Sequence, residues 1–535
     1  MKRFIYILFL LSIGLIFTGC QKNFSPILLR ENQASLSEVK DLDDLSFDIE
    51  KISFSKTYQN IAPEIEIIKQ GLDHKVLASL GLINSSGVEI EKITRNGKEI
   101  DIFVSNKNKY RTNQLVVPQL VIDIKDIPPG RLENYKFNIH NLNYKPIKIK
   151  LDAHEAMNIV NSSSQVYMAT YPNINISKNK SNYFWTLEYN NIFDKVYKDS
   201  PLINLRATID ADTGEIVETS KVPVSTYIDN GVLLGSIFND YLIYKKIDLL
   251  ASKDTIESLW SYNIKAKEKK NLFTSDGKII SASFSPDNKY IVLLESGEKS
   301  NSVYIINLSE SKAYKINFEN TINPEIVRWK DKSNIYIVHK DGSRNLISNY
   351  DVEKDDFEMI LGTKKNIVDF QVYNGYFLIT EIIDSDNNIS SIYLSRDLKE
   401  IIYKDSGYKG KFINKDQFAY IKGDRESDKD KIYIFDISEN KLLDSPEYNI
   451  SDYTVLSESS LALIEKIENN RMFKLYQYDL DKQESTSLAD MPSGKTVLNL
   501  FENTLYINTN LPFEEKENRI IYALDISQIN TNTEP

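Results

Sequence analysis

The residue types that carry most enzyme chemistry are scarce in this sequence. The chain has four histidines, His74, His140, His154 and His339. His154 and Glu155 begin like the zinc-binding pattern His-Glu-x-x-His, but Asn158 stands where the second histidine would be. We therefore interpret His154 as an exposed residue in the first turn of a helix, and His339 as a structural residue of a strand.

Other sequence patterns for catalysis or metal binding are also missing. There is no Gly-x-Ser-x-Gly elbow and no glycine-rich phosphate loop. Asp210, Asp212 and Glu215 could bind calcium, but the twelve-residue loop spacing is absent, so we expect a hairpin turn. We likewise expect loops or solvated hairpins at Asp384–Asn388 and Lys265–Lys270. We predict no catalytic residue, no metal ligand and no cofactor, and we interpret the three tryptophans as core residues: Trp185, Trp260 and Trp329.

The first twenty residues have the layout of a secretory signal. Lys2 and Arg3 precede the apolar run Phe4–Phe17, which is too short to span a bilayer, since spanning takes about 20 apolar residues. Cys20, the only cysteine of the chain, follows the small residues Thr18 and Gly19. An exported protein with one thiol cannot form an internal disulfide, so Cys20 needs another explanation.

The segment Phe17-Thr18-Gly19-Cys20 resembles the lipobox of bacterial lipoproteins, with Phe17 where that family usually has Leu. The resemblance implies cleavage before Cys20 and attachment of lipid to its sulfur. We expect residues 1–19 to be a signal peptide and the mature protein to be held by lipid on Cys20 at the extracytoplasmic face of the cell membrane. An ordinary signal peptide with a chance cysteine is the alternative.

The charge of the chain bears on its partners. The formal net charge is −11, and it becomes −13 once Lys2 and Arg3 are removed with the signal peptide. A nucleic-acid-binding protein has a basic face, so we expect no nucleic-acid partner. A hydrophobic content of 41% is sufficient for large cores.

A short motif recurs through the second half of the chain. The motif begins with an apolar residue, which is usually followed by Tyr or Trp. Two or three further residues lead to an Asp or Asn, and an apolar residue comes next. The Asp or Asn positions are Asn263, Asn307, Asp351, Asp397, Asp436, Asp479 and Asp525, separated by 44, 44, 46, 39, 43 and 46 residues. A second short apolar segment precedes each motif, as in Lys289–Leu293. A period of 40–45 residues is typical of a four-stranded propeller blade.

One repeat shows a whole blade. It has strands at Lys278–Phe284, Tyr290–Glu295, Ser302–Leu308 and Lys312–Phe318. The segment Phe284–Tyr290 resembles the blade signature of TolB-like and WD40-like propellers, and the resemblance covers roughly residues 230–527. We predict a β-propeller at residues 221–535 with seven blades, six or eight being alternatives.

The last repeat has no sequence left for an outer strand. We expect Val222–Ile228 to supply it and to close the ring, with Pro223 tolerated because an outer strand has one unpaired edge.

Residues 145–220 have a different pattern. Asp152 can cap a helix whose apolar face includes Ala156, Ile159 and Val160. Strand-like segments follow at Val166–Tyr171, Asn182–Tyr189 and Leu202–Ile209, and the turn Asp210–Ile216 ends the region. A helix followed by such a meander resembles the PepSY domain, a small α+β domain thought to bind or restrain partners of exported proteins.

Residues 41–144 are expected to be a β-rich domain of no recognised family. Val88–Ile93 and Glu99–Val104 flank Asn96-Gly97, a strong hairpin signal, and Leu115–Ile124 is a further strand candidate. Ile67–Leu82 is a candidate helix. Residues 20–40 are polar and are interpreted as a tether to the membrane.

The fold class is thus mainly β, with a propeller preceded by a small α+β domain and a β-rich N-terminal domain. We expect a membrane-anchored, non-enzymatic lipoprotein that binds a protein or peptide and serves as a scaffold or regulator of an envelope enzyme or sensor. Two alternatives remain open: an envelope hydrolase of glycans or peptides with its site at the propeller channel, and a solute-binding propeller.

Overall fold

The structure is a computed structural model that describes residues 43–527, except for residues 56–57, 59, 71–72, 108–113, 197–198, 236, 250–254, 319–321, 342–343, 365, 385–388, 425–428, 468–471, 495 and 512–517. The predicted signal peptide, Cys20 and the tether lie outside the described residues, as do residues 385–388 of the predicted loop. Within the described part of the chain, no helix has the length and apolar character needed to cross a membrane.

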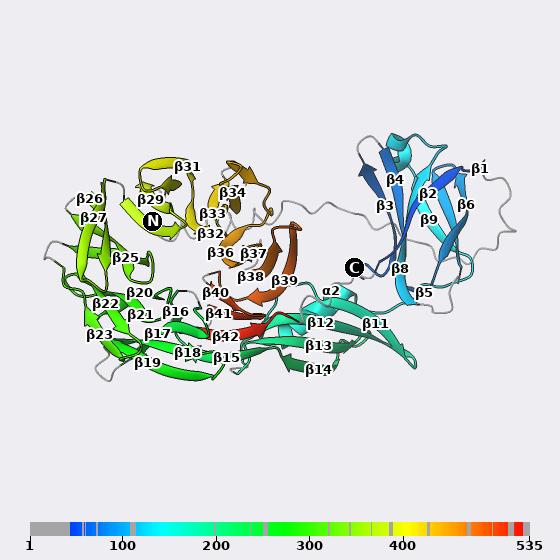
Figure 1. The fold of residues 1–535 in the computed structure, drawn as a ribbon. Coiled ribbons are helices and arrows are strands. Elements are labelled where there is room, and N and C mark those ends of the chain that lie inside the picture. Colours follow the sequence, from blue (N-terminus) through cyan, green and yellow to red (C-terminus); the bar gives the residue numbers. More distant parts are fainter. Residues whose placement is uncertain are drawn as a thin grey trace, which may run out of the picture. The chain divides into compact units, whose positions relative to one another are not determined.

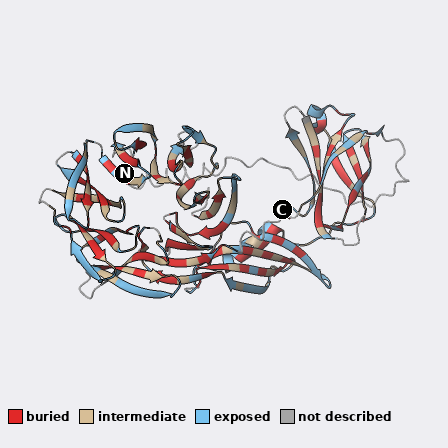
Figure 2. Cartoon of the chain, viewed as in Figure 1, coloured by how far each residue is buried: buried red, intermediate tan, exposed pale blue. Residues whose placement is uncertain are grey.

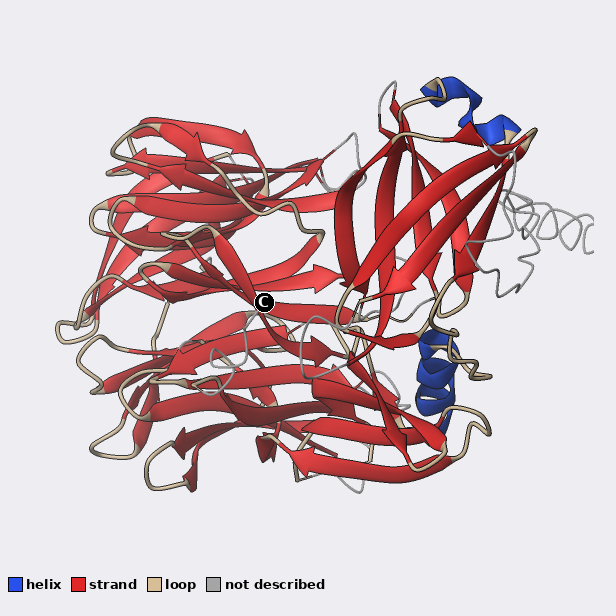
Figure 3. Cartoon of the chain, turned by 90° about the vertical axis from the view of Figure 1, so that its right-hand side faces the viewer, coloured by secondary structure: helices blue, strands red, loops and turns tan. Residues whose placement is uncertain are grey.

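The chain forms two compact units, and strands make up most of the described residues (Figure 3). One unit comprises the described residues of Met1–Val160 with Ile174–Leu187 and Ala207–Glu218. The other comprises Asn161–Asn173, Glu188–Arg206 and the described residues of Thr219–Pro535. The domain boundaries expected from the sequence stay predictions.

Two sheets near the N-terminal end share one core and form a sandwich. One has the order β1 (Asp43–Asp44), β6 (Val88–Asn96), β7 (Glu99–Asn106) and β9 (Lys136–Asn141), with β7 and β9 parallel. The other has the order β2 (Phe47–Ser55), β8 (Gln114–Ile124), β4 (Asp73–Leu80) and β3 (Pro63–Gln70), with β5 (Ile83–Ser85) also on β8. The short 3-10 helix η2 covers Pro129–Asn134. Alternate residues of facing strands fill the core, among them Ile100, Ile102, Val104, Leu120 and Ile122. The β-rich prediction for this region is confirmed.

The predicted helix at Ile67–Leu82 is wrong. This segment lies in the antiparallel hairpin of β3 and β4, paired from Pro63↔Leu80 to Gln70↔Asp73. Val76, Ala78 and Leu80 are fully buried at every second position, which is strand periodicity. The hairpin at Asn96-Gly97 is confirmed, and Gly97 adopts a φ of +57° that glycine tolerates best.

The predicted capped helix is present as α2 (Ala153–Ser163). The backbone N–H of Glu155 donates to Asp152 Oδ1 at 2.8 Å, and Glu155 Oε2 accepts from the N–H of Asp152 at 2.9 Å, which makes a capping box. An antiparallel sheet accompanies the helix, with the order β10 (Val166–Tyr167), β12 (Asn182–Asp194), β13 (Leu202–Asp210) and β14 (Ile216–Pro223), and with β11 (Asn173–Asn179) on β12. The helix and the strands at Asn182–Tyr189 and Leu202–Ile209 are as expected, but the expected strand Val166–Tyr171 is limited to Val166–Tyr167 and β11 was not predicted. The likeness to PepSY stays a prediction.

Seven four-stranded antiparallel sheets follow, one for each repeat, and the predicted fold class is confirmed (Figure 1). The first has β16 (Val232–Leu233), β17 (Tyr241–Leu249), β18 (Thr255–Asn263) and β19 (Glu268–Ser275); the second β20 (Lys278–Phe284), β21 (Tyr290–Ser296), β22 (Asn301–Asn307) and β23 (Lys312–Lys315). The third has β24 (Asn323–Trp329), β25 (Asn334–Asp341), β26 (Arg344–Asp351) and β27 (Asp356–Thr363); the fourth β28 (Asn366–Tyr373), β29 (Tyr376–Asp384), β30 (Ile389–Arg396) and β31 (Glu400–Ser406). The fifth has β32 (Tyr408–Phe412), β33 (Gln417–Asp424), β34 (Lys429–Asp436) and β35 (Lys441–Leu443); the sixth β36 (Ile450–Ser457), β37 (Ser460–Lys466), β38 (Phe473–Asp479) and β39 (Glu484–Met491). The seventh has β40 (Thr496–Phe501), β41 (Thr504–Leu511), β42 (Asn518–Asp525) and β15 (Ser225–Asn230).

The seventh sheet closes as predicted, because a strand from before the first repeat is its outer strand. Strand β15 pairs with β42, with Ser225 opposite Leu524 and Tyr227 opposite Tyr522. The predicted limits differ from the observed ones. Pro223 ends β14 and does not belong to the blade, since the chain changes sheets at Val224.

The second strands of the blades show why apolar runs indicate this fold. Ile291, Val292, Leu293 and Leu294 of β21 are consecutive and all buried. Val292 and Leu294 belong to the core shared with the next blade, whereas Ile291 and Leu293 belong to the core shared with the previous one. Both faces of β21 are therefore covered, and Figure 2 shows buried residues along the strands of the other blades. Each such side chain contributes about 1.5–3 kcal/mol by its burial.

Candidate ligand site in the propeller channel

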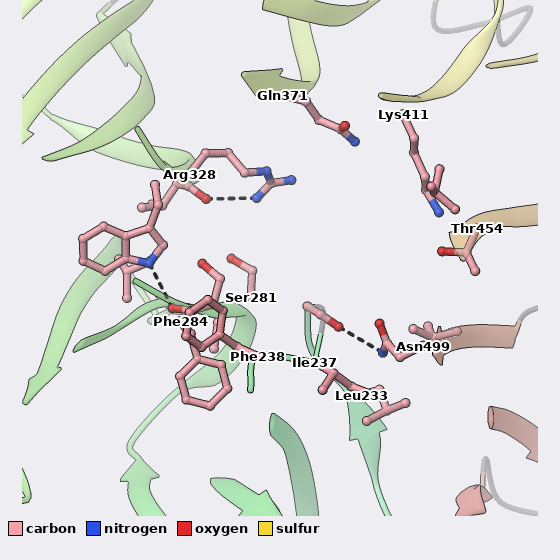
Figure 4. Close-up of a pocket in the computed structure, with 18 of the residues that line it drawn as sticks. Leu233, Ile237, Phe238, Ser281, Phe284, Arg328, Gln371, Lys411, Thr454 and Asn499 are labelled. Carbon is pink, nitrogen blue, oxygen red and sulfur yellow. Dashed lines mark hydrogen bonds between the residues drawn. The ribbon is translucent and has the colours of Figure 1, made fainter. Parts of the chain in front are cut away.

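The innermost strands of all seven blades line one cavity of about 690 Å³ (Figure 4). Each of these strands is an edge strand of its sheet, so the edge that faces away from the second strand has no strand partner. Seven separate sheets that all contribute to one cavity must be arranged around an axis. The cavity is therefore the propeller's central channel, and its volume is within the range of small-ligand sites.

The innermost strands of blades two to six each carry a bulge. The pairing with the second strand shifts between Ile279 and Ser281 in β20, and again in β24, β28, β32 and β36. A bulge adds a residue to one strand and redirects the side chains that follow it. Asp369 and Asp452 each resume the pairing after a bulge, two residues before Gln371 and Thr454, which line the cavity.

Two cations line the channel. Arg328 comes from β24, and its guanidinium contacts Asp369 Oδ1 at 3.2 Å and donates to the Val327 carbonyl at 2.9 Å. Lys411 comes from β32, and its ammonium donates to the Tyr453 carbonyl at 2.7 Å and lies 5.1 Å from the centre of the Tyr453 ring. Among the described residues, Lys411 makes no ion pair.

The carboxylates near Lys411 do not contact its ammonium. Burial lowers the pKa of Lys411, with Lys409 acting in the same direction and Asp452 and Asp369 opposing it. Asp452 is 3.1 Å from Lys409, and Asp369 contacts Arg328, so each nearby carboxylate already has a cation. A bound anion could therefore contact the Lys411 ammonium without displacing a carboxylate from it.

Neutral hydrogen-bonding groups complete this side of the channel. Gln371 from β28 belongs to the blade between those of Arg328 and Lys411, and Thr454 from β36 belongs to the next blade. Figure 4 shows these four side chains extending toward the cavity from consecutive blades. A guanidinium, a carboxamide, an ammonium and a hydroxyl together supply the donors that a carboxylate or another small oxyanion requires.

The part of the channel formed by blades one and two carries aromatic and aliphatic side chains beside the hydroxyls of Ser281 and Ser283. Phe238 and Phe284 lie with ring centres 6.1 Å apart, and Leu233 and Ile237 continue this surface. Trp329 donates from its ring nitrogen to the Ser283 carbonyl of the neighbouring blade at 3.0 Å. Trp329 is half-buried and packs against the core between blades two and three, in keeping with the predicted core role, and it also lines the channel, which was not predicted.

The other two tryptophans are not in the channel. Trp185 is fully buried, as predicted. Trp260 is half-buried in β18 and donates from its ring nitrogen to Ser258 Oγ at 2.8 Å.

The residues singled out in the sequence lie elsewhere. His154 is exposed in the first turn of α2. His339 is buried in β25 with Nε2 3.0 Å from Ser348 Oγ, and burial lowers the pKa of its imidazole, which favours the neutral form. Asp210 Oδ1 accepts from the N–H groups of Asp212 and Thr213 at 3.0 and 2.9 Å, so this segment is the predicted turn. Among the described residues, no group of three or more His, Cys, Asp or Glu side chains is arranged to hold a metal ion.

The channel residues were missed although the sequence carries a signal for them. Arg328, Gln371, Lys411 and Thr454 are separated by 43, 40 and 43 residues, which is close to the blade period, and all four side chains can donate hydrogen bonds. Residues at equal offsets in consecutive blades face the same channel. A search for polar side chains that recur at the blade period in the least apolar strand of each repeat would have found these four.

Comparison with known proteins adds little to this picture. No protein-family model matches the chain, and no curated protein matches it either. Among solved structures, the β-propeller domain of the Trilobed protease from Pyrococcus furiosus matches 56% of this chain and 95% of its own, with 14% identity and a TM-score of 0.41. An oligogalacturonate lyase in complex with manganese matches 61% of this chain and 97% of its own, with 10% identity and a TM-score of 0.45.

A puromycin-hydrolysing peptidase from Mycobacterium tuberculosis matches 56% of this chain and 51% of its own, with 9% identity and a TM-score of 0.43. All three identities are under 25% and all three TM-scores under 0.5. The propeller assignment accordingly rests on the seven sheets of this chain and the channel that they share.

Proposed function

We propose that this chain is an exported binding protein, anchored by lipid on Cys20, whose propeller channel receives part of a protein or peptide partner in the cell envelope. One observation carries the proposal. Lys411 is a partly desolvated cation without a carboxylate partner among the described residues, and it lies among further donors in a cavity of ligand size. A buried charge without a partner is costly, so a site that retains one is suited to a ligand that supplies the opposite charge.

The composition of the channel favours binding over hydrolysis. A glycosidase uses two carboxylates, one as acid and the other as base or nucleophile. None of the described residues that line the cavity is a carboxylate or a histidine. Asp369 and Asp452, the nearest carboxylates of the innermost strands, contact Arg328 and Lys409. Neither is available as a proton donor without loss of an ion pair.

The N-terminal part of the chain supports the envelope location. The lipobox-like segment Phe17–Cys20 is the basis for the lipid anchor, and the capped helix α2 with its meander fits a small partner-binding domain such as PepSY. A lipid-anchored protein held near other envelope proteins meets a partner at high effective concentration. Regulation of an envelope enzyme or sensor is the role that these features suit.

Crosslinking on intact cells tests the proposal. Thr454→Trp places a large side chain in the channel, and Thr226→Trp makes the same change on the exposed outer strand β15. We expect capture of a partner with wild-type protein and with Thr226→Trp, and at least a tenfold loss with Thr454→Trp. Equal capture by both variants would show that the partner does not use the channel.

The anchor is tested separately with Cys20→Ala. We expect the variant to leave the membrane fraction and appear in the soluble extracytoplasmic fraction. A variant that stays membrane-bound contradicts the lipid anchor.

A further inference from the structure

The channel has a charged side and an apolar side, and this division restricts the ligand. Resting on the proposed binding function, we infer that the channel binds the free C-terminal carboxylate of a peptide whose last residue has a large apolar side chain. The carboxylate lies between Lys411 and Arg328, and the apolar side chain packs against Phe284 and Trp329.

The charged side of the channel has donors that remain free for an anion. Arg328 offers N–H groups beyond the two that contact Asp369 and Val327, since a guanidinium has five donors. Lys411 uses one of its three donors on the Tyr453 carbonyl, which leaves two. Gln371 lies on the blade between them and presents a carboxamide to the same side of the cavity (Figure 4).

The apolar side is held in place before a ligand arrives. Trp329 is fixed by its hydrogen bond to the Ser283 carbonyl, and Phe238 and Phe284 pack on each other. Ordered aromatic rings lose little conformational entropy on binding, so they contribute affinity efficiently. A ligand that unites a carboxylate with an apolar group therefore uses both sides of the cavity.

Two observations favour a peptide end over a polyanion. The innermost strands have unpaired inner edges, so their N–H and C=O groups are placed to bond a peptide backbone. The whole chain has a net charge of −11, whereas the cavity lining has two cations and no acidic residue among its described members. The surrounding field repels a polyanion, but a single carboxylate is attracted at short range.

Calorimetric titration of the detergent-solubilised full chain tests the inference. The probes are acetyl-Ala-Ala-Phe with a free carboxylate, the same peptide as its C-terminal amide, and 3-phenylpropionate. We expect the acid peptide to bind at least tenfold more tightly than the amide and than 3-phenylpropionate. Equal affinity of acid and amide would overturn the inference, and equal affinity of 3-phenylpropionate would replace the peptide by a small apolar acid.

Variants identify the residues responsible. Lys411→Met and Gln371→Glu are each expected to reduce the affinity for the acid peptide at least tenfold and to leave the affinity for the amide within about twofold. Lys312→Met, a matched change on an exposed outer strand, is expected to change neither. A preference for the acid that persists in both channel variants contradicts the inference.

The peptide titration and the crosslinking experiment can fail independently, so they test the inference and the proposed function separately. If Thr454→Trp abolishes capture of a partner but neither peptide binds, the channel is a binding site and the C-terminal inference is wrong. If Thr454→Trp leaves capture unchanged, the proposed channel function fails, whichever peptide binds.

Discussion

The hydroxyl of Tyr420 donates to Asp405 Oδ2 at 2.8 Å, and this contact joins blade five to the outer strand of blade four. The same arrangement recurs three blades later in the ring, where Tyr244 donates to Asp229 Oδ2 at 2.7 Å. In both places the Asp comes two residues before a glycine and fifteen before the tyrosine. A lysine two residues after the tyrosine, Lys422 or Lys246, also contacts the carboxylate.

Loss of this hydroxyl is expected to weaken the junction between blades. Tyr420→Phe removes one of the donors to Asp405 but leaves Lys422, whose ammonium is 2.9 Å from each carboxylate oxygen. A hydrogen bond to a charged acceptor contributes about 1.5–3 kcal/mol, so we expect a loss near the lower end of that range. Urea unfolding measures it. Tyr314→Phe on an exposed outer strand is the control, and an equal effect of the two changes would contradict the role of the junction.

The glycine of the junction is needed for space. A Cβ built on Gly407 would lie 2.6 Å from a ring carbon of Tyr420 and 2.9 Å from the Ile421 carbonyl oxygen. Because backbone and an anchored ring cannot both move, we expect Gly407→Ala to destabilise the protein by about 1–3 kcal/mol. Gly130→Ala, where nothing lies within 4 Å, should be nearly neutral in the same urea assay. Similar urea midpoints for the two variants would show that the junction has space for a side chain at position 407.

A buried carboxylate attaches the loop after β10 to blade six. Asp490 is fully buried and accepts from the backbone N–H groups of Ala169 and Thr170 at 2.6 and 2.9 Å, and from the Thr170 hydroxyl. Asp490→Ala leaves these donors without an acceptor, so we expect a loss of about 2–4 kcal/mol in urea unfolding. Asp490→Asn keeps one acceptor and should lose much less. Equal losses would show that the negative charge, and not the acceptor, holds the loop.

The titration of Asp490 gives this attachment a pH dependence. Burial raises the pKa of Asp490 above its ordinary value of 3.8, and its hydrogen bonds oppose the shift without cancelling it. The folded protein then binds this proton more tightly than the unfolded chain, so the contribution of Asp490 to stability falls as pH rises from about 3.8 through the raised pKa. We expect Asp490→Asn to gain stability relative to wild type over that interval. A difference between the two proteins that does not change with pH would contradict the shift.

Binding of a carboxylate in the channel should also depend on pH. Burial lowers the pKa of Lys411 below its ordinary value of 10.5, and a bound carboxylate raises it again, so binding takes up a proton when Lys411 is neutral. We expect the affinity for the acid peptide to fall as pH rises through the pKa of Lys411 in the free protein. Titrations from neutral pH upward measure it. Lys411→Met should remove this pH dependence as well as most of the affinity.

Much of the propeller could be predicted from the sequence because its second and third strands are buried on both faces. Segments such as Lys289–Leu293 must be continuously apolar, and the period of the third-strand motif counts the blades. The outer strand of the seventh blade was predictable because the last repeat has no segment that could form its own fourth strand. The hairpin β3–β4 was misjudged since the apolar residues of Ile67–Leu82 fit both a helix and two strands, and only the burial of alternate residues distinguishes them.

The sequence by itself thus predicted a mainly β chain and a propeller of seven blades, with six or eight as alternatives, and it contains a lipobox-like segment at Phe17–Cys20. The tertiary structure alone decided which side chains meet in the channel. Arg328, Gln371 and Lys411 are about 40 residues apart along the chain, and they share a site because consecutive blades turn their innermost strands toward one axis. Bulges in those strands set the direction of each side chain, and the pairing that creates a bulge does not exist until the blades have formed.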